Sequence, residues 1–78
     1  MSKKHIEECV RTSLEGYFKD LHGTEPDGMY EMMVRVVEKP LLEVVMRHAE
    51  QNQSRAAEWL GLNRNTLRKK LVEHKLIG

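Results

Sequence analysis

The residues from about Gly28 to Ala49 constrain the fold more than any other part of this 78-residue chain. Helical periodicity predicts one long helix here, with its charged residues on a single narrow stripe. That stripe contains Glu31, Arg35, Glu38, Lys39, Glu43 and Arg47. Almost every other position is apolar, so the helix must be covered on several sides. One amphipathic neighbour and a small terminal unit cannot cover it, whereas a second copy can, and we therefore predict an obligate homodimer.

The length and composition of the chain agree with a small subunit that relies on a partner. Seventy-eight residues form one domain at most, and so short a chain buries a modest share of its surface alone. Cys9 is the single cysteine, which excludes an internal disulfide and indicates a reducing compartment. No apolar stretch is long enough to span a membrane, and the first residues lack a signal peptide's apolar run. We expect a cytoplasmic protein without a membrane partner.

Local patterns predict how the N-terminal half is divided. Apolar residues at steps of three and four predict a helix over about 3–21, with Ser2 as its cap and Gly23 at its end. Turn-forming residues follow, and Asp27 is a candidate cap for the long helix. Pro40 lies inside that helix, where we expect a kink because the apolar and charged patterns continue on both sides. The alternative is two separate helices.

The C-terminal third predicts two short helices joined by a tight turn. Asn52 and Asn63 suit the caps of helices over 53–60 and about 64–74. Gly61 lies between them and tolerates the positive φ that such a turn requires. The apolar scaffold consists of Ala57, Leu60, Leu62, Leu67 and Leu71. This arrangement is typical of a helix-turn-helix.

The basic charge of the chain is concentrated at the same end. Residues 1–48 hold seven Lys and Arg against nine Asp and Glu, a net charge of −2. Residues 49–78 hold six against three, a net charge of +3. Most of the excess comes from Arg64, Arg68, Lys69 and Lys70. Such a cluster is the footprint of a phosphate-binding surface, although charge alone also fits a solvated helix face.

The outward face of the last helix favours contact with DNA. When Leu67 and Leu71 face the core, the helical rotation directs other residues outward. These are Asn65, Thr66, Arg68 and Lys69. Arg can donate two hydrogen bonds to guanine, Asn can pair with adenine, and Thr and Lys can hold phosphates. The first residues of a recognition helix usually reach base edges in the major groove, which indicates Asn63, Arg64, Asn65 and Arg68.

Three runs of residues are similar to one bacterial family. They are KPLLEVVM at 39–46, NQSRAA at 52–57 and GLNRNTLRKKL at 61–71. Together they closely resemble Fis, the factor for inversion stimulation, and the C-terminal domain of NtrC-type activators shares the same helix-turn-helix. The likeness spans about Val10 to the C-terminus and is most specific in the last 30 residues.

The resemblance implies an all-α fold with four helices per subunit and an intertwined homodimer. Residues 1–78 would form a single Fis-like domain, with dimerisation helices in 1–50 and the helix-turn-helix in 51–78. The two recognition helices of such a dimer lie closer together than one turn of B-DNA, so the DNA must bend. The implied function is that of a sequence-tolerant DNA-binding and DNA-bending protein, nucleoid-associated and acting as a global transcription regulator.

The resemblance also implies the roles of individual residues. Arg64 takes the place of a guanine-contacting arginine, and Asn63 that of its base-proximal neighbour. The positions that match DNA-backbone contacts are Asn52, Gln53, Ser54, Arg55, Thr66, Arg68, Lys69 and Lys70. Asn65 stands where Fis commonly has glycine, so the sequence preference should differ in detail. Better-known members carry a longer N-terminal segment with arms that activate DNA invertases, so we do not expect stimulation of recombination here.

Other functions fit the sequence less well than DNA binding does. His5 and Cys9 could hold a metal together, but no third ligand is apparent, and Cys9 has no convincing base and orienting partner. We expect no metal, cofactor, small-molecule substrate or enzymatic activity. One rival is the DNA-binding module of a larger activator, which needs an ATPase or receiver domain that this chain, with its own Met1, lacks. The other is a dimeric interaction protein that never binds DNA, which leaves the basic face unexplained.

Overall fold

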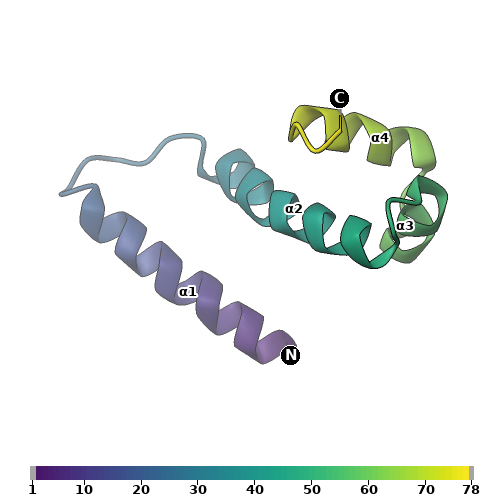
Figure 1. Cartoon of the computed structure of the whole chain (residues 1–78). Coiled ribbons are helices and arrows are strands. Elements are labelled where there is room, and N and C mark those ends of the chain that lie inside the picture. The colour runs from purple at the N-terminus through teal and green to yellow at the C-terminus, as the bar shows by residue number, and fades with distance from the viewer. Residues whose placement is uncertain (1, 78) are drawn as a thin grey trace.

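The computed structural model describes residues 2–77, and its regular structure is helical throughout that range (Figure 1). The helices are α1 (Lys3–Asp20), α2 (Met29–His48), α3 (Gln53–Leu60) and α4 (Arg64–Glu73). Met1 and Gly78, the two ends of the predicted single domain, lie outside the described residues. No strand occurs within the described range, so the predicted all-α fold with four helices is confirmed.

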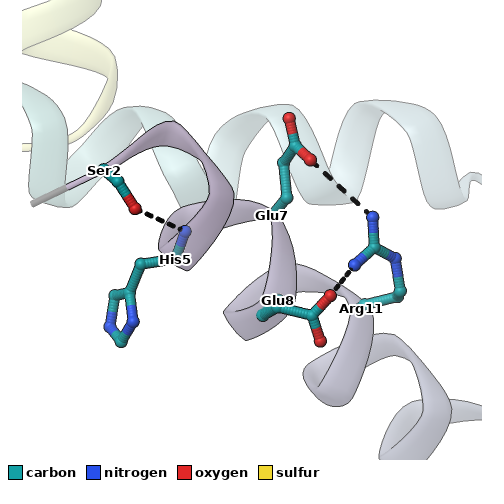
Figure 2. A network of polar contacts seen from close by, with 5 residues as sticks. All are labelled: Ser2, His5, Glu7, Glu8 and Arg11. Carbon is teal, nitrogen blue, oxygen red and sulfur yellow. Dashed lines mark hydrogen bonds and ion pairs between the residues drawn. The ribbon is translucent and has the colours of Figure 1, made fainter.

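The first turns of α1 are stabilised by local contacts near the N-terminus of the helix (Figure 2). The Oγ of Ser2 accepts a hydrogen bond from the backbone N–H of His5 at 3.2 Å, which confirms the predicted cap. Arg11 pairs with Glu7 at 3.8 Å and with Glu8. These ion pairs are exposed and contribute little to stability. No residue of α1 is buried, so its helical form depends on local contacts.

The beginning of α2 differs from the sequence-based prediction, and its middle forms one continuous helix, as predicted. The N-cap residue is Gly28, with φ +63° and no capping side chain, so the prediction of an Asp27 cap is wrong. The chain turns at Gly28 in the left-handed conformation that glycine adopts without strain. The helix runs through Pro40 without interruption, which excludes the alternative of two separate helices. One proline removes a single backbone hydrogen bond, which a long packed helix can tolerate.

The core lies where α3 and α4 fold against the C-terminal half of α2 (Figure 1). Its buried apolar residues are Leu42, Met46, Ala49, Ala56, Ala57, Leu67 and Leu71. After α4 the amide of Leu76 donates to the carbonyl of Leu71 at 2.8 Å, with Lys75 in the left-handed conformation. Leu76 and Ile77 pack against the core, so the chain folds back after α4 up to Ile77.

The N-terminal part of the molecule is much more open. Helix α1 is followed by an extended connection that leads to α2, and it lies away from the core (Figure 1). Large apolar side chains of α1 and α2 remain exposed, namely Ile6, Phe18, Tyr30, Val34, Val36, Val37, Leu41 and Val44. Tyr30 is 86% exposed. The chain is accordingly elongated, with extents of 44 × 28 × 17 Å.

Candidate nucleic-acid interface

Helices α3 and α4 form a helix-turn-helix joined through Gly61 and Leu62. Gly61 has φ +71°, in the left-handed region where a Cβ atom would cause strain. The amide of Leu62 donates to the carbonyl of Ala57 at 2.9 Å, and the Leu62 side chain packs against the core. Ala57 itself is buried. The turn predicted at Gly61 is therefore confirmed.

Two asparagine caps begin the helices of this motif, as the sequence predicted. The Oδ1 of Asn52 accepts from the amide of Arg55 at 3.1 Å, and the Oδ1 of Asn63 accepts from the amide of Asn65 at 2.8 Å. In each cap the side-chain oxygen accepts the hydrogen bond, and the Nδ2 group of the same side chain, which can only donate, takes no part in it. Neither Nδ2 group has a hydrogen bond within residues 2–77. Both helices therefore begin beside an amide donor that suits DNA oxygen atoms.

The outer face of α4 carries the side chains that the helical periodicity predicts to face outward. Leu67 and Leu71 are fully buried, which confirms the predicted core face. The residues at the start of α4 and on its outer face are exposed, and they are Asn63, Arg64, Asn65, Thr66, Arg68 and Lys69. The last four of these line one surface hollow together with Val72 and Glu73. Asn65, Thr66, Arg68 and Lys69 thus share one accessible surface, and Asn63 and Arg64 are exposed at the start of α4.

Three cations of this surface keep their charge available. Arg64, Arg68 and Lys69 are exposed, and none of them has an ion pair in the part of the chain that the structure describes. Arg64 also occupies the first position of α4, where the partial positive charge of the helix end adds to its own. This arrangement is suited to phosphates and to the acceptor atoms of guanine.

The start of α3 contributes two accessible residues and one that turns inward. Ser54 and Arg55 are exposed, as backbone-contacting side chains would have to be. Gln53 is half-buried, and its Oε1 is buried without a hydrogen-bond partner in the described range. Gln53 is therefore less accessible than its neighbours.

Lys70 differs from the other predicted site residues because its charge is already paired. Its Nζ lies 2.8 Å from Oε2 of Glu38 on α2. The other carboxylate oxygen, Oε1, lies 2.8 Å from Nε2 of His74. An ionised carboxylate only accepts, so Nε2 of His74 carries the hydrogen in this contact. One carboxylate thus joins two residues of α4 to α2.

The burial of this cluster affects its titration. The Glu38 and Lys70 side chains are 17% and 32% exposed, and that of His74 is 6% exposed. Hydrogen bonds from Lys70 and then from His74 lower the pKa of Glu38, and its partial burial opposes them. The hydrogen bond to Glu38 raises the pKa of Lys70. The carboxylate and the ammonium group therefore hold each other in their charged forms.

Sequence reasoning missed the roles of Glu38 and His74. Glu38 belongs to the predicted charged stripe of the long helix, and the residues it contacts lie 32 and 36 positions away. One signal was available, because a helix that buries Leu67 and Leu71 also turns position 74 toward its core side. Trp59 on α3 was also missed, and it is 55% exposed.

Other kinds of site find less support in the geometry. The Sγ of Cys9 lies 3.8 Å from Nε2 of His5, but no group of three or more potential metal ligands occurs within residues 2–77. In the same range, no helix combines the length and apolar character needed to cross a bilayer.

Comparison with known proteins gives consistent similarities. A family model described as bacterial regulatory protein, Fis family, matches residues 33–74. The chain is 53% identical over 77 residues to a protein of Ralstonia nicotianae named as a Fis-like DNA-binding protein, covering 99% of this chain and 100% of the relative. A protein of Neisseria meningitidis serogroup B with the same name is 60% identical over 92% of this chain and 91% of its own length. DNA-binding protein Fis of Photobacterium profundum is 42% identical over 95% and 76%.

Proposed function

Because this chain belongs to the Fis family of bacterial regulatory proteins, we propose that it binds DNA as a homodimer and reads the major groove with α4. The observation that carries the proposal is the exposed outer face of α4, where Arg64, Arg68 and Lys69 have no ion pair with any of residues 2–77. The names of the similar proteins, which describe them as DNA-binding, support the same role. The proposed role is that of a regulator and not of an enzyme.

The contacts are proposed to divide into two kinds. Arg64 donates to the O6 and N7 atoms of a guanine, while Asn63 and Asn65 lie next to neighbouring bases. The DNA backbone is held by the start of α3 and by the flanks of α4. These backbone residues are Asn52, Gln53, Ser54, Arg55, Thr66, Arg68 and Lys69. The resemblance alone would add Lys70, whose charge is already paired with Glu38. Backbone contacts fix the register of the protein on the duplex, and base contacts provide its sequence preference.

The open apolar surface of α1 and α2 supports the homodimer. Val34, Val37 and Leu41 of α2 are between 43% and 48% exposed. They line a groove together with Val10 and Met33, which extends the apolar surface onto α1. A second copy placed on a two-fold axis presents the same apolar surface and would cover this groove. We propose the intertwined arrangement of dimerisation helices within residues 1–50, with the DNA-binding unit in 51–78.

The larger-scale role follows from such a dimer. Two α4 helices held closer together than one turn of B-DNA would require the DNA to bend before both can enter the major groove. The cost of bending depends on the sequence being bent, which gives a tolerant and shape-dependent preference. We propose a nucleoid-associated protein of the bacterial cytoplasm that acts as a global transcription regulator.

The first experiment is the Arg64→Ala variant. Binding is measured by fluorescence anisotropy with a duplex that the unaltered protein selects from a random pool. We expect a loss of about 1 to 3 kcal/mol in specific binding, with the dimer intact in analytical ultracentrifugation. Arg11→Ala is the matched control, since Arg11 is an exposed arginine on α1 whose partners are Glu7 and Glu8.

A salt titration of the unaltered protein completes the test. The logarithm of the affinity should fall steeply with the logarithm of the salt concentration, because each phosphate contact releases counterions. Unchanged affinity in Arg64→Ala with an intact dimer would favour a protein-interaction role over DNA reading.

A further inference from the structure

The contact between α2 and α4 through Glu38 differs from the other ion pairs in the described part of the chain. Arg11 pairs with residues three and four positions away on its own helix, and those side chains are about 60% exposed. The Glu38 pairs instead span 32 and 36 positions, at 2.8 Å each, and join two helices. Only pairs of this second kind can influence how one helix is placed against another.

Burial makes these contacts difficult to exchange for others. The Glu38 side chain is 17% exposed, so its charge has lost most of its hydration. If Lys70 moved away to reach a phosphate, the carboxylate would keep His74 as its only partner in the described range. Removing one partner from a largely buried charge is far more costly than breaking an exposed pair. Lys70 is therefore held by Glu38.

Lys69 provides the contrast on the same helix. Its side chain is exposed, lines the outer hollow of α4 and has no ion pair within residues 2–77. Lys70 lies one position, or about 100° of rotation, further round the helix, toward the side that buries Leu67 and Leu71. Two adjacent lysines thus face different surroundings, one outside the helix-turn-helix and one against α2.

We propose that Glu38, Lys70 and His74 form a positioning cluster that fixes the orientation of α4 against α2, and that Lys70 acts in this cluster and not as a phosphate contact. This inference rests on the proposed DNA-binding function. In the proposed dimer α2 belongs to the dimerisation unit, so the cluster sets the angle and spacing at which the two α4 helices approach the DNA. A recognition surface that is loose by about 1 Å loses much of its selectivity.

The proposal separates two quantities that a simple phosphate contact would change together. A phosphate contact adds to overall affinity and to its salt dependence, whatever the DNA sequence. A positioning residue changes the ratio between the affinities for selected and unrelated DNA, and leaves the salt dependence almost unchanged. Lys69 and Lys70 should therefore give different results when each is replaced by methionine, which keeps an unbranched side chain and removes the charge.

The experiment compares Lys70→Met with Lys69→Met. Affinities are measured at several salt concentrations for a duplex selected by the unaltered protein and for a shuffled duplex of the same composition. Lys69→Met should lower the salt slope by about one per bound subunit on both duplexes. Lys70→Met should leave the slope unchanged and reduce the selected-to-shuffled ratio about tenfold, on the order of one lost base contact.

A second pair of variants tests the cluster from α2, which lies outside the proposed DNA surface. Glu38→Gln should reduce the selected-to-shuffled ratio as Lys70→Met does. Glu43→Gln is the control, since Glu43 is an exposed glutamate on α2 without an ion pair in the described range. The Glu38→Gln, Lys70→Met double variant should lose no more selectivity than Glu38→Gln alone, because the single change at Glu38 already removes the charge that pairs with Lys70. Circular dichroism establishes that each variant is helical. If Glu38→Gln does not fold, the comparison of Lys70→Met with Lys69→Met still tests the proposal.

The outcomes distinguish the inference from the function on which it rests. If the unaltered protein shows no salt-dependent binding to either duplex, the proposed function fails. If it binds, but Lys70→Met lowers the salt slope as much as Lys69→Met and keeps the selectivity, Lys70 is a phosphate contact and the positioning cluster is overturned. An unchanged selected-to-shuffled ratio in Glu38→Gln would also overturn it.

Discussion

The two halves of the molecule bury their apolar side chains to different extents. The helix-turn-helix and the end of α2 enclose a core of their own, in which Leu42, Leu67 and Leu71 are almost completely inaccessible. Helix α1 has no fully buried residue, and the valines in the first part of α2 remain exposed. The difference teaches that one chain is enough to enclose the core that supports the outer face of α4. The apolar surface of α1 and the first part of α2, in contrast, is suited to a partner.

The largest effect should come from placing a charge on the open surface of α2. Leu41 is 48% exposed, and Leu41→Asp should cost at least about 4 kcal/mol per subunit if a second copy buries this position. The variant should sediment as a monomer, and its unfolding by urea should be measured at several protein concentrations.

Val72→Asp is the matched control, because Val72 is 51% exposed and lies on α4. Without DNA present, it should change stability by no more than about 0.5 kcal/mol. A similarly small effect of Leu41→Asp would contradict the comparison, since it would mean that the N-terminal helices need no partner.

The next effect concerns the enclosed core. Leu67→Ala removes most of a fully buried side chain and should destabilise the protein by about 3 kcal/mol, through lost burial and the cavity left behind. Urea unfolding followed by circular dichroism measures the loss. Val72→Ala on the same helix should be nearly neutral, and equal losses in the two variants would show that the α4 core is not enclosed as described.

A pair of glycine substitutions should act in opposite directions in the two regions. Gly61→Ala places a side chain at φ +71° and should destabilise by about 1 kcal/mol. The strain is conformational, because within residues 2–77 no atom beyond the adjacent residues lies within 4 Å of the added Cβ. Gly16 lies inside α1 with open space around it, so Gly16→Ala should stabilise by up to about 1 kcal/mol. Thermal unfolding of both variants tests the pair, and a loss at Gly16 would indicate that a close neighbour approaches α1.

The smallest effect should be the acid sensitivity of the link between α2 and α4. Glu38 has its pKa lowered mainly by the hydrogen bond from Lys70, then by that from His74. In the unfolded chain it titrates near its ordinary 4.5, so the pairing contributes fully above that pH and is lost as the pH falls through the lower folded-state pKa. Lys70, whose pKa is raised, stays charged throughout. His74 also lines a groove between α2 and the end of α4, and the other charged residues of that groove are Arg35, Lys39, Glu73 and Lys75.

Unfolding free energies of the unaltered protein and of Glu38→Gln should therefore converge as the solution is acidified below about pH 4.5. Parallel curves over the whole acid range would show that the carboxylate contributes no pH-dependent stability.

Features that depend on neighbouring residues could be predicted from the sequence. The caps at Ser2, Asn52 and Asn63 and the turn at Gly61 each involve a few adjacent positions, and all four are confirmed. The outer face of α4 followed from its helical period. The Asp27 cap was wrong because a preference for capping does not show which residue of a turn will have the left-handed backbone.

Contacts between distant residues could not be predicted in the same way. Nothing in the local pattern connects Glu38 with Lys70, and the similarity of Lys70 to its basic neighbours suggested a DNA contact for all of them. The charge of a residue is visible in the sequence, but its partner depends on how two helices meet. The structure supplies that partner through the packing of α4 on α2.

The exposure of Trp59 has a practical consequence. This is the single tryptophan of the chain, and it lies on α3 with just over half of its side chain in water. Its emission therefore reports on one place, the short helix α3 that begins at the Asn52 cap and precedes α4. Intrinsic fluorescence can follow complex formation on unlabelled protein, with an optical signal already present in the natural sequence.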